Sequence, residues 1–120
     1  GVGTDVVDIE RFARIMRRSR DGFREHLFTD REIAYCERYK KSEASYAAVF
    51  AAKEAFLKAL RTGLAPGMRW KDAEVIHERS GAPSIVAHGL CAEPLAGGRV
   101  HVTLSHSDLA ATAVVNIEDA

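Results

Sequence analysis

Two carboxylates stand out in this sequence because each interrupts an apolar segment. Asp5 lies within a valine-rich stretch at the start of the chain, and Glu54 lies within an alanine-rich run in its middle. A buried carboxylate requires a partner, since without one it takes up a proton. Together the two could bind Mg²⁺, which takes one or two protein carboxylates and fills its other positions with water and substrate phosphate. Alternatively, Asp5 accepts hydrogen bonds from backbone or threonine groups, or faces solvent at a sheet edge.

Lys58 is a third candidate, because it follows Glu54 by four residues and therefore shares a helix face with it. Beside a bound phosphate, its ammonium group would neutralise charge on the leaving group. The simpler interpretation is a Glu54–Lys58 ion pair on a solvated face, which contributes only about 0.3 kcal/mol.

His106 is a fourth candidate, and it lies in a predicted turn between two serines. It could contact a phosphate or carry a proton, or it could be an exposed turn histidine. A Ser-His-Asp hydrolase is not favoured, although Ser105 and Asp108 flank it. Adjacency in sequence does not make a triad, and no GxSxG elbow is present.

Arg11, Arg14 and Arg18 have the spacing of one helix face, nearly opposite an apolar face within residues 9–16. The chain carries 17 Lys and Arg against 17 Asp and Glu, so no whole-molecule field attracts nucleic acid or an anionic membrane. The arginines are therefore a local basic patch. It is either a solvated face or a docking surface for an acidic protein; no nucleic-acid-binding motif accompanies it.

The first half of the chain predicts a strand and three helices that would position these residues. The strand is the valine-rich segment 2–9, and a first helix follows it until Gly22. Thr29 and Glu32 form a capping box that opens a second helix to about Tyr39. Ser42 could cap a third, longer helix from Glu43 to about Arg61.

The second half predicts strands. Residues 73–77 and 84–87 flank a turn signal and suggest a hairpin, and two further strands are expected over residues 99–105 and 110–117. We therefore expect one α+β domain over residues 1–120, a small antiparallel sheet packed with one long and two shorter helices on one side.

The chain contains neither a run of roughly 18 apolar residues nor a charged-then-apolar leader, so no membrane span or secretion signal is expected. Cys36 and Cys91 have neither CxxC nor zinc spacing, which indicates packed thiols in a reducing compartment. We expect a cytoplasmic protein that binds neither membrane nor nucleic acid.

Three segments resemble the holo-acyl-carrier-protein synthases, which are the short, bacterial-type 4′-phosphopantetheinyl transferases. They are GVGTDVVDI at residues 1–9, FAAKEAFLKAL at residues 50–60 and TLSHS at residues 103–107. The resemblance covers essentially the whole chain. It implies a homotrimer that binds coenzyme A between neighbouring subunits and moves its 4′-phosphopantetheine group to a serine of an acyl carrier protein. The reaction would need Mg²⁺, with Mn²⁺ as a possible substitute, and would release 3′,5′-ADP.

The resemblance also implies a role for each matching residue. Asp5 and Glu54 match the metal ligands, Lys58 matches the lysine near the transferred phosphate, and His106 matches a histidine of the coenzyme A site. These four form the expected catalytic set, with Asp5 as the candidate base. Further expected contacts to coenzyme A are Lys41, Lys53, Gly63 and Ser105, beside Lys58 and His106. The expected carrier-docking residues are Arg11, Arg14, Arg18 and Phe23.

Two positions depart from the family pattern. Val49 stands where an arginine is common, and Arg61 stands where a glycine is common. The lost arginine removes one phosphate contact, for which Lys41 or Arg61 could compensate. The alternative functions are a non-catalytic module that binds coenzyme A or carrier protein on the same fold, and a small basic-patch interaction protein. Of these functions, only the transferase predicts a mass gain on the carrier that EDTA stops. The carrier could serve fatty-acid or polyketide synthesis.

Overall fold

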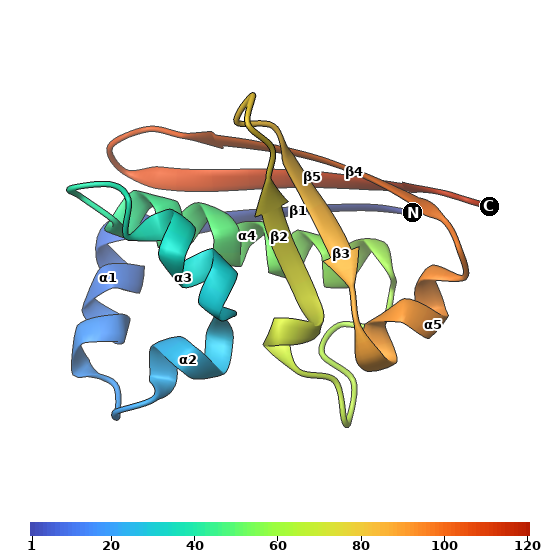
Figure 1. Cartoon of the computed structure of the whole chain (residues 1–120), viewed down its shortest axis with the longest axis horizontal. Helices are drawn as coiled ribbons and strands as arrows, with labels where there is room; N and C mark the ends of the chain where they lie inside the picture. Colours follow the sequence, from blue (N-terminus) through green and yellow to red (C-terminus); the bar gives the residue numbers. More distant parts are fainter.

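The computed structural model describes residues 1–120 and contains five strands, five α-helices and two short 3-10 turns. Figure 1 shows a long central helix lying against a sheet, with three helices gathered at one end. In chain order the elements are β1 Val2–Asp8, α1 Ile9–Arg18, α2 Phe23–Leu27, α3 Asp30–Cys36, α4 Glu43–Ala59, η1 Trp70–Asp72, β2 Ala73–His77, β3 Pro83–Ala87, η2 Gly89–Cys91, α5 Ala92–Leu95, β4 Arg99–His106 and β5 Ala110–Glu118.

The strands form two antiparallel sheets. The larger has the order β1-β5-β4, with Asp5 opposite Ala113 and Leu104 opposite the same residue from the other side. The smaller is the β2–β3 hairpin, whose second strand packs beside β4. Alternate residues of β5 point inward and are buried against α4, as the pleat of a strand requires.

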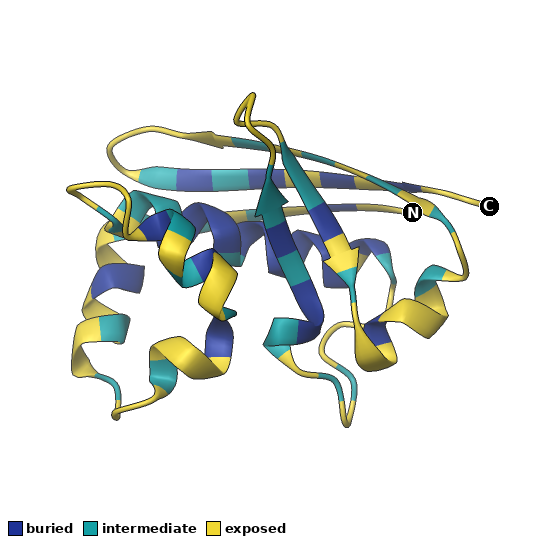
Figure 2. Ribbon diagram, in the orientation of Figure 1, coloured by how far each residue is buried: buried dark blue, intermediate teal, exposed yellow.

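Helix α4 lies at the centre of the molecule, and most of its residues are buried (Figure 2). Its many alanines let β1 approach closely. A Cβ atom added at Gly3 would overlap the carbonyl oxygen of Ala55 and lie 2.7 Å from the backbone nitrogen of Ala59. Glycine is therefore required at position 3 for this contact, which brings the Asp5 segment of β1 alongside the Glu54 segment of α4.

The outer face of the three-stranded sheet is not covered by any helix. Val2 and Val6 of β1 are 69% and 67% exposed, and Val114 of β5 is 44% exposed. In the sheet register Val6 lies opposite Thr112, and Thr4 and Thr103 lie on either side of Val114. The face therefore combines exposed β-branched side chains from three strands, a feature of surfaces that bind another protein.

The predicted α+β class is confirmed, as are the strand, the hairpin and the Thr29–Glu32 capping box. Helix α3 ends at Cys36 and α4 at Ala59, each a few residues earlier than expected. The side chain of Ser42 makes no cap hydrogen bond, because its backbone is already helical.

Helices α2 and α5 were not predicted, since five and four residues are too few to show a helical repeat. Both cysteines are buried free thiols, in agreement with the sequence-based interpretation. No helix is long and apolar enough to cross a membrane.

Candidate active site

Strand β1 and helix α4 bring Asp5 and Glu54 together in one surface hollow of about 310 Å³. Asp8, Arg11 and Phe50 also line it. Asp8 is engaged locally, since its Oδ1 accepts a hydrogen bond from the backbone N–H of Arg11 at 2.8 Å and caps α1. Asp5 and Glu54 are therefore the carboxylates of the hollow that do not cap a helix.

Lys58 is paired with Asp5 in this structure. Its Nζ lies 3.0 Å from Oδ1 of Asp5 and donates a second hydrogen bond of 3.0 Å to the carbonyl oxygen of Thr4. The ion pair that the helix spacing suggested between Glu54 and Lys58 is not present, because β1 passes within reach of the lysine. The Asp5 side chain is only 15% exposed, whereas that of Lys58 is 52% exposed.

The environment of Glu54 makes its ionised form less favourable than that of a glutamate in water. Burial raises the pKa of its carboxyl group, and the nearby charge of Asp5 raises that pKa further, while Lys58 acts in the opposite direction. A divalent cation between the two carboxylates would offset the repulsion that the Asp5 charge exerts on ionised Glu54. No group of three or more His, Cys, Asp and Glu side chains forms a metal-binding cluster. A hard cation at Asp5 and Glu54 would thus keep most of its positions for water and phosphate, as Mg²⁺ does.

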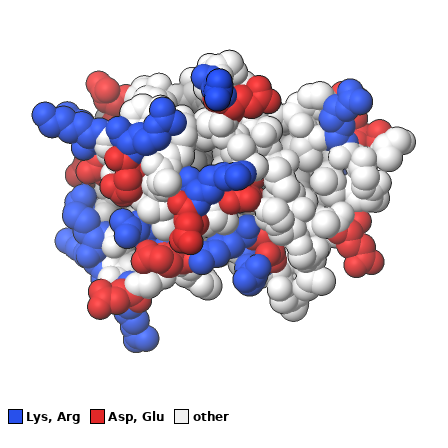
Figure 3. Space-filling model, in the orientation of Figure 1, with Lys and Arg blue, Asp and Glu red and all other residues white.

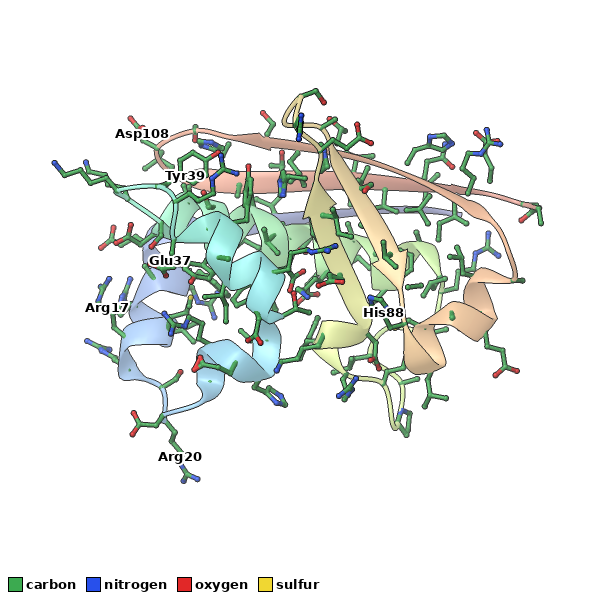
Figure 4. The ribbon with its side chains drawn as sticks, in the orientation of Figure 1. Arg17, Arg20, Glu37, Tyr39, His88 and Asp108 are labelled. Atoms are coloured by element: carbon green, nitrogen blue, oxygen red, sulfur yellow. The ribbon has the colours of Figure 1, made fainter.

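The basic face of α1 borders this acidic hollow. Arg11 and Ile15 line both the acidic hollow and a neighbouring one, which Arg14 and Arg18 complete. Phe23 lines a separate small hollow at the same end of the molecule, together with Arg20 and Arg24. Figure 3 shows Lys and Arg gathered over the α1 and α2 end of the molecule, and Figure 4 shows Arg17 and Arg20 pointing outward there. A basic surface thus reaches continuously from the outer end of α1 to Asp5 and Glu54.

His106 lies in a different hollow, of about 470 Å³, with Lys41. This second hollow shares no lining residue with the acidic one. It borders α4 at Ala48, which precedes Glu54 by six residues and therefore points about 120° away around the helix axis. Within one chain, the expected catalytic residues thus divide between two faces of α4.

Lys53 cannot take its expected role. Its side chain is 0% exposed, and its Nζ lies 2.8 Å from Oε1 of Glu32. It also donates hydrogen bonds to the carbonyl oxygens of Trp70 and Ala73, at 3.0 and 2.8 Å. The prediction that Lys53 contacts coenzyme A is wrong, because its ammonium group is enclosed and fully used inside the protein.

Three other residues lie outside both hollows. Gly63 is exposed in the loop after α4, and Ser105 is exposed near the end of β4. Arg61 lines a hollow near the chain termini, at the opposite end of α4 from Lys41. Of the two cations considered as replacements for the arginine absent at Val49, only Lys41 shares a hollow with His106.

The second hollow also contains residues that the sequence analysis did not single out. They are the aromatic side chains Tyr35, Tyr39 and His77, which come from α3, the segment after it and β2. Their spacing in the sequence does not indicate a site, because only the fold brings the end of β2 back to α3.

A two-carboxylate hollow with an adjacent lysine has the donor types that a divalent cation and a phosphate ester require. Comparison with known proteins identifies the class further. Residues 1–114 match the model of the 4′-phosphopantetheinyl transferase superfamily, and the chain belongs to that superfamily.

The similarity to holo-acyl-carrier-protein synthases extends over nearly the full length. The synthase of Koribacter versatilis is 40% identical over 99% of this chain and 98% of its own. That of Geobacter sulfurreducens is 43% identical over 98% of this chain and 96% of its own. The crystal structure of the Helicobacter pylori synthase in complex with coenzyme A covers 98% of this chain and 100% of its own, with a TM-score of 0.85 and 29% identity. The resemblance found in the three sequence motifs is thereby confirmed.

Proposed function

We propose that this chain transfers the 4′-phosphopantetheine group of coenzyme A to a serine of an acyl carrier protein and releases 3′,5′-ADP. The observation that carries the proposal is the meeting of Asp5 and Glu54, from two distant family motifs, in one hollow bordered by Lys58 and by the α1 arginines. The relatives named above are holo-acyl-carrier-protein synthases, and one was solved with coenzyme A.

The reaction forms one P–O bond and breaks another. The carrier serine Oγ attacks the phosphorus next to pantetheine, the bond from that phosphorus to the 3′,5′-ADP oxygen breaks, and the serine proton leaves to a base. Asp5 is the candidate base, directly or through water, since it is a carboxylate that lines the hollow where the phosphate would bind. Lys58 offsets negative charge that builds on the phosphate, and most of the acceleration comes from positioning and charge stabilisation.

We propose Mg²⁺, with Mn²⁺ as a substitute, as the ion of the Asp5–Glu54 site. The donor set fits: two carboxylate side chains, with no histidine or cysteine in the lining of the hollow. Such an ion supplies neutralisation of charge on the diphosphate when bound.

We further propose that the active site is completed by a second copy of the chain, in a homotrimer. The His106 hollow and the acidic hollow lie on different faces of α4, so a coenzyme A molecule that uses both would have to bridge two copies. A heterologous contact whose rotation closes after three copies gives such a ring of identical subunits. The exposed outer face of the sheet, around Val2, Val6 and Val114, supplies an apolar surface for that contact.

We assign the carrier-docking role to the face formed by Arg11, Arg14, Arg18 and Phe23. Its continuity with the acidic hollow would lead a serine from a negatively charged partner directly to Asp5 and Glu54. Cytoplasmic location and a role in fatty-acid synthesis stay predictions.

The direct test incubates the protein with coenzyme A, Mg²⁺ and an apo acyl carrier protein, and then measures the intact mass of the carrier. We expect the mass of one phosphopantetheine group to be added, the gain to stop with EDTA and to return with excess Mg²⁺. Coenzyme A binding without any mass gain would instead favour the non-catalytic module.

The shared site is tested by mixing two inactive variants. Glu54→Ala removes the acidic hollow of its own copy, and His106→Ala alters the second hollow of its own copy. If each site takes one hollow from each of two copies, an equimolar mixture regains up to about one quarter of the wild-type rate after subunit exchange, since each mixed trimer has one intact site. A mixture that stays as inactive as its components would show that both hollows must belong to one chain.

A further inference from the structure

Helix α2 carries Phe23, yet little of this helix is anchored in the protein. It has five residues, begins at Gly22 without a side-chain cap, and buries only Leu27. In the view of Figure 1 it lies at the lower edge of the helical end of the molecule. A helix this short is not stable by itself, because too few further turns follow its costly first turn. Contacts with other elements must therefore hold α2, and with it Phe23, in place.

A chain of three side chains connects α2 to the central helix α4. The hydroxyl group of Tyr46, in α4, donates a hydrogen bond of 2.5 Å to Oε2 of Glu37. The same oxygen of Glu37 lies 3.5 Å from Nη1 of Arg24, in α2. Glu37 directly follows α3, so this chain crosses the end of one helix and joins two others (Figure 4 labels Glu37). The three residues form the Tyr46–Glu37–Arg24 bridge.

The inner end of the bridge is fixed. Tyr46 is 3% exposed, and its ring packs against that of Phe28, with the centroids 5.0 Å apart. Burial, followed by the hydrogen bond to Glu37, raises the pKa of Tyr46, so its hydroxyl group keeps its proton at neutral pH. Arg24 and Glu37 are each about half exposed, and an ion pair between two such side chains contributes little by itself. The buried hydroxyl group is therefore the part of the bridge that holds Glu37 in one position.

Arg24 has a second acidic neighbour, which provides a comparison within the same helix. Its Nε lies 3.2 Å from Oε2 of Glu25, the next residue of α2. The side chains of Glu25 and Glu37 are almost equally exposed, at 48% and 49%. Removing either acid takes the same charge from beside Arg24, but only the loss of Glu37 separates α2 from Tyr46.

We propose that the Tyr46–Glu37–Arg24 bridge positions α2 for docking of the carrier protein. This inference rests on the proposed function, which makes Phe23 a contact of the carrier. Arg24 lines the same hollow as Phe23, whereas Tyr46 and Glu37 do not line it. Tyr46 and Glu37 are therefore positioning residues, which act on the carrier through Arg24. A helix that is already held in place does not have to be ordered when the carrier binds, which favours binding.

The test compares the variants Tyr46→Phe, Glu37→Ala and Glu25→Ala in steady-state kinetics with an apo acyl carrier protein. Tyr46→Phe removes the hydroxyl group and keeps the ring that packs against Phe28. We expect Tyr46→Phe and Glu37→Ala to raise the apparent carrier KM about threefold, with kcat and the KM for coenzyme A unchanged. Glu25→Ala is the matched control. It removes an acid beside a basic face, so its carrier KM should stay at the wild-type value or fall.

A second measurement follows α2 without any carrier. The backbone N–H groups of His26 and Phe28 donate hydrogen bonds to carbonyl oxygens at the start of α2. Hydrogen exchange of these two amides should become faster in Tyr46→Phe and in Glu37→Ala, and stay at the wild-type rate in Glu25→Ala.

Three results would overturn the inference. An unchanged carrier KM in Tyr46→Phe would show that docking does not need the bridge, even if exchange in α2 became faster. A carrier KM that falls in Glu37→Ala as in Glu25→Ala would show that both acids act only through their charge. A raised KM with unchanged exchange would show that the bridge does not act by holding α2. Failure of the proposed function looks different, because the wild-type protein itself would then add no mass to a carrier, and the docking role would fail with it.

Discussion

The ammonium nitrogen of Lys58 lies 3.0 Å from a carboxylate oxygen of Asp5, across the contact between α4 and β1. Glu54 lies one helical turn before Lys58 and lines the same hollow as Asp5. Lys58 pairs with Asp5, while burial and then the charge of Asp5 raise the pKa of Glu54. This arrangement of one cation and two carboxylates leaves net negative charge where a divalent ion would bind.

Replacing Lys58 should slow phosphate chemistry more than substrate binding. Lys58→Ala removes the cation that offsets charge on the leaving phosphate, and we expect kcat to fall about 100-fold. Steady-state kinetics with saturating coenzyme A and carrier would measure this kcat. The control is Lys71→Ala, which replaces a lysine in the turn before β2. A kcat for Lys58→Ala equal to that of the control would remove the lysine from the mechanism.

Glu54 should titrate above the ordinary glutamate value of 4.5 in the metal-free protein. A cation binds the ionised carboxylate, so metal affinity should decline as the pH falls through this raised pKa. Asp5→Asn removes the charge that contributes to the shift and frees Lys58, and both changes should bring the Glu54 pKa down. Carbon-13 NMR of the side-chain carboxyl would follow the titration. A Glu54 pKa that is at or below 4.5 and insensitive to Asp5→Asn would contradict the electrostatic account.

Lys53 should act on stability and not on coenzyme A. Lys53→Ala leaves the buried carboxylate of Glu32 without its ion-pair partner, and we expect a loss of about 3–5 kcal/mol in the free energy of unfolding. Urea denaturation would measure the loss, and the double change Lys53→Met with Glu32→Leu should recover much of it. Lys58→Ala, which removes a lysine that is itself 52% exposed, should cost less than about 1 kcal/mol. Equal costs for the two alanine variants would refute the role given to Lys53.

The arginine face should govern affinity for the carrier. Arg14→Glu combined with Arg18→Glu should raise the apparent carrier KM about tenfold at low salt and less at high salt, where exposed charges are screened. The matched control is Arg31→Glu with Arg79→Glu, which makes the same charge change at exposed positions away from α1. If the two double variants raise the KM equally, the effect comes from net charge and the docking face is not on α1.

The fold class and the local elements were predictable because their signals are local. The capping box at Thr29 and the alternation in β5 depend on neighbours within a few residues. That Asp5 and Glu54 line the same hollow was predictable only because both belong to recognisable family motifs. No periodicity connects a strand at residue 5 with a helix at residue 54.

The sequence-based interpretations that the structure contradicts concern residues whose environment depends on contacts between distant segments. Lys53 carries the signature of a surface residue, and its burial depends on Glu32, which also caps α3 and accepts a hydrogen bond of 2.8 Å from the backbone N–H of Val75. Lys58 forms its ion pair with Asp5 and not with Glu54, because Gly3 allows β1 to pass close to α4. The stack of Tyr35 on His77 likewise depends on how β2 returns to α3, which spacing alone does not reveal.

The most direct test of the Asp5–Glu54 ion site is a titration with Mn²⁺ in the presence of coenzyme A, followed by electron paramagnetic resonance. We predict one tight Mn²⁺ site per chain in the wild-type protein. Binding should be weakened at least about tenfold by Glu54→Gln and by Asp5→Asn, with the fold unchanged by circular dichroism. Mn²⁺ binding of wild-type strength in both variants would show that these two carboxylates do not hold the ion.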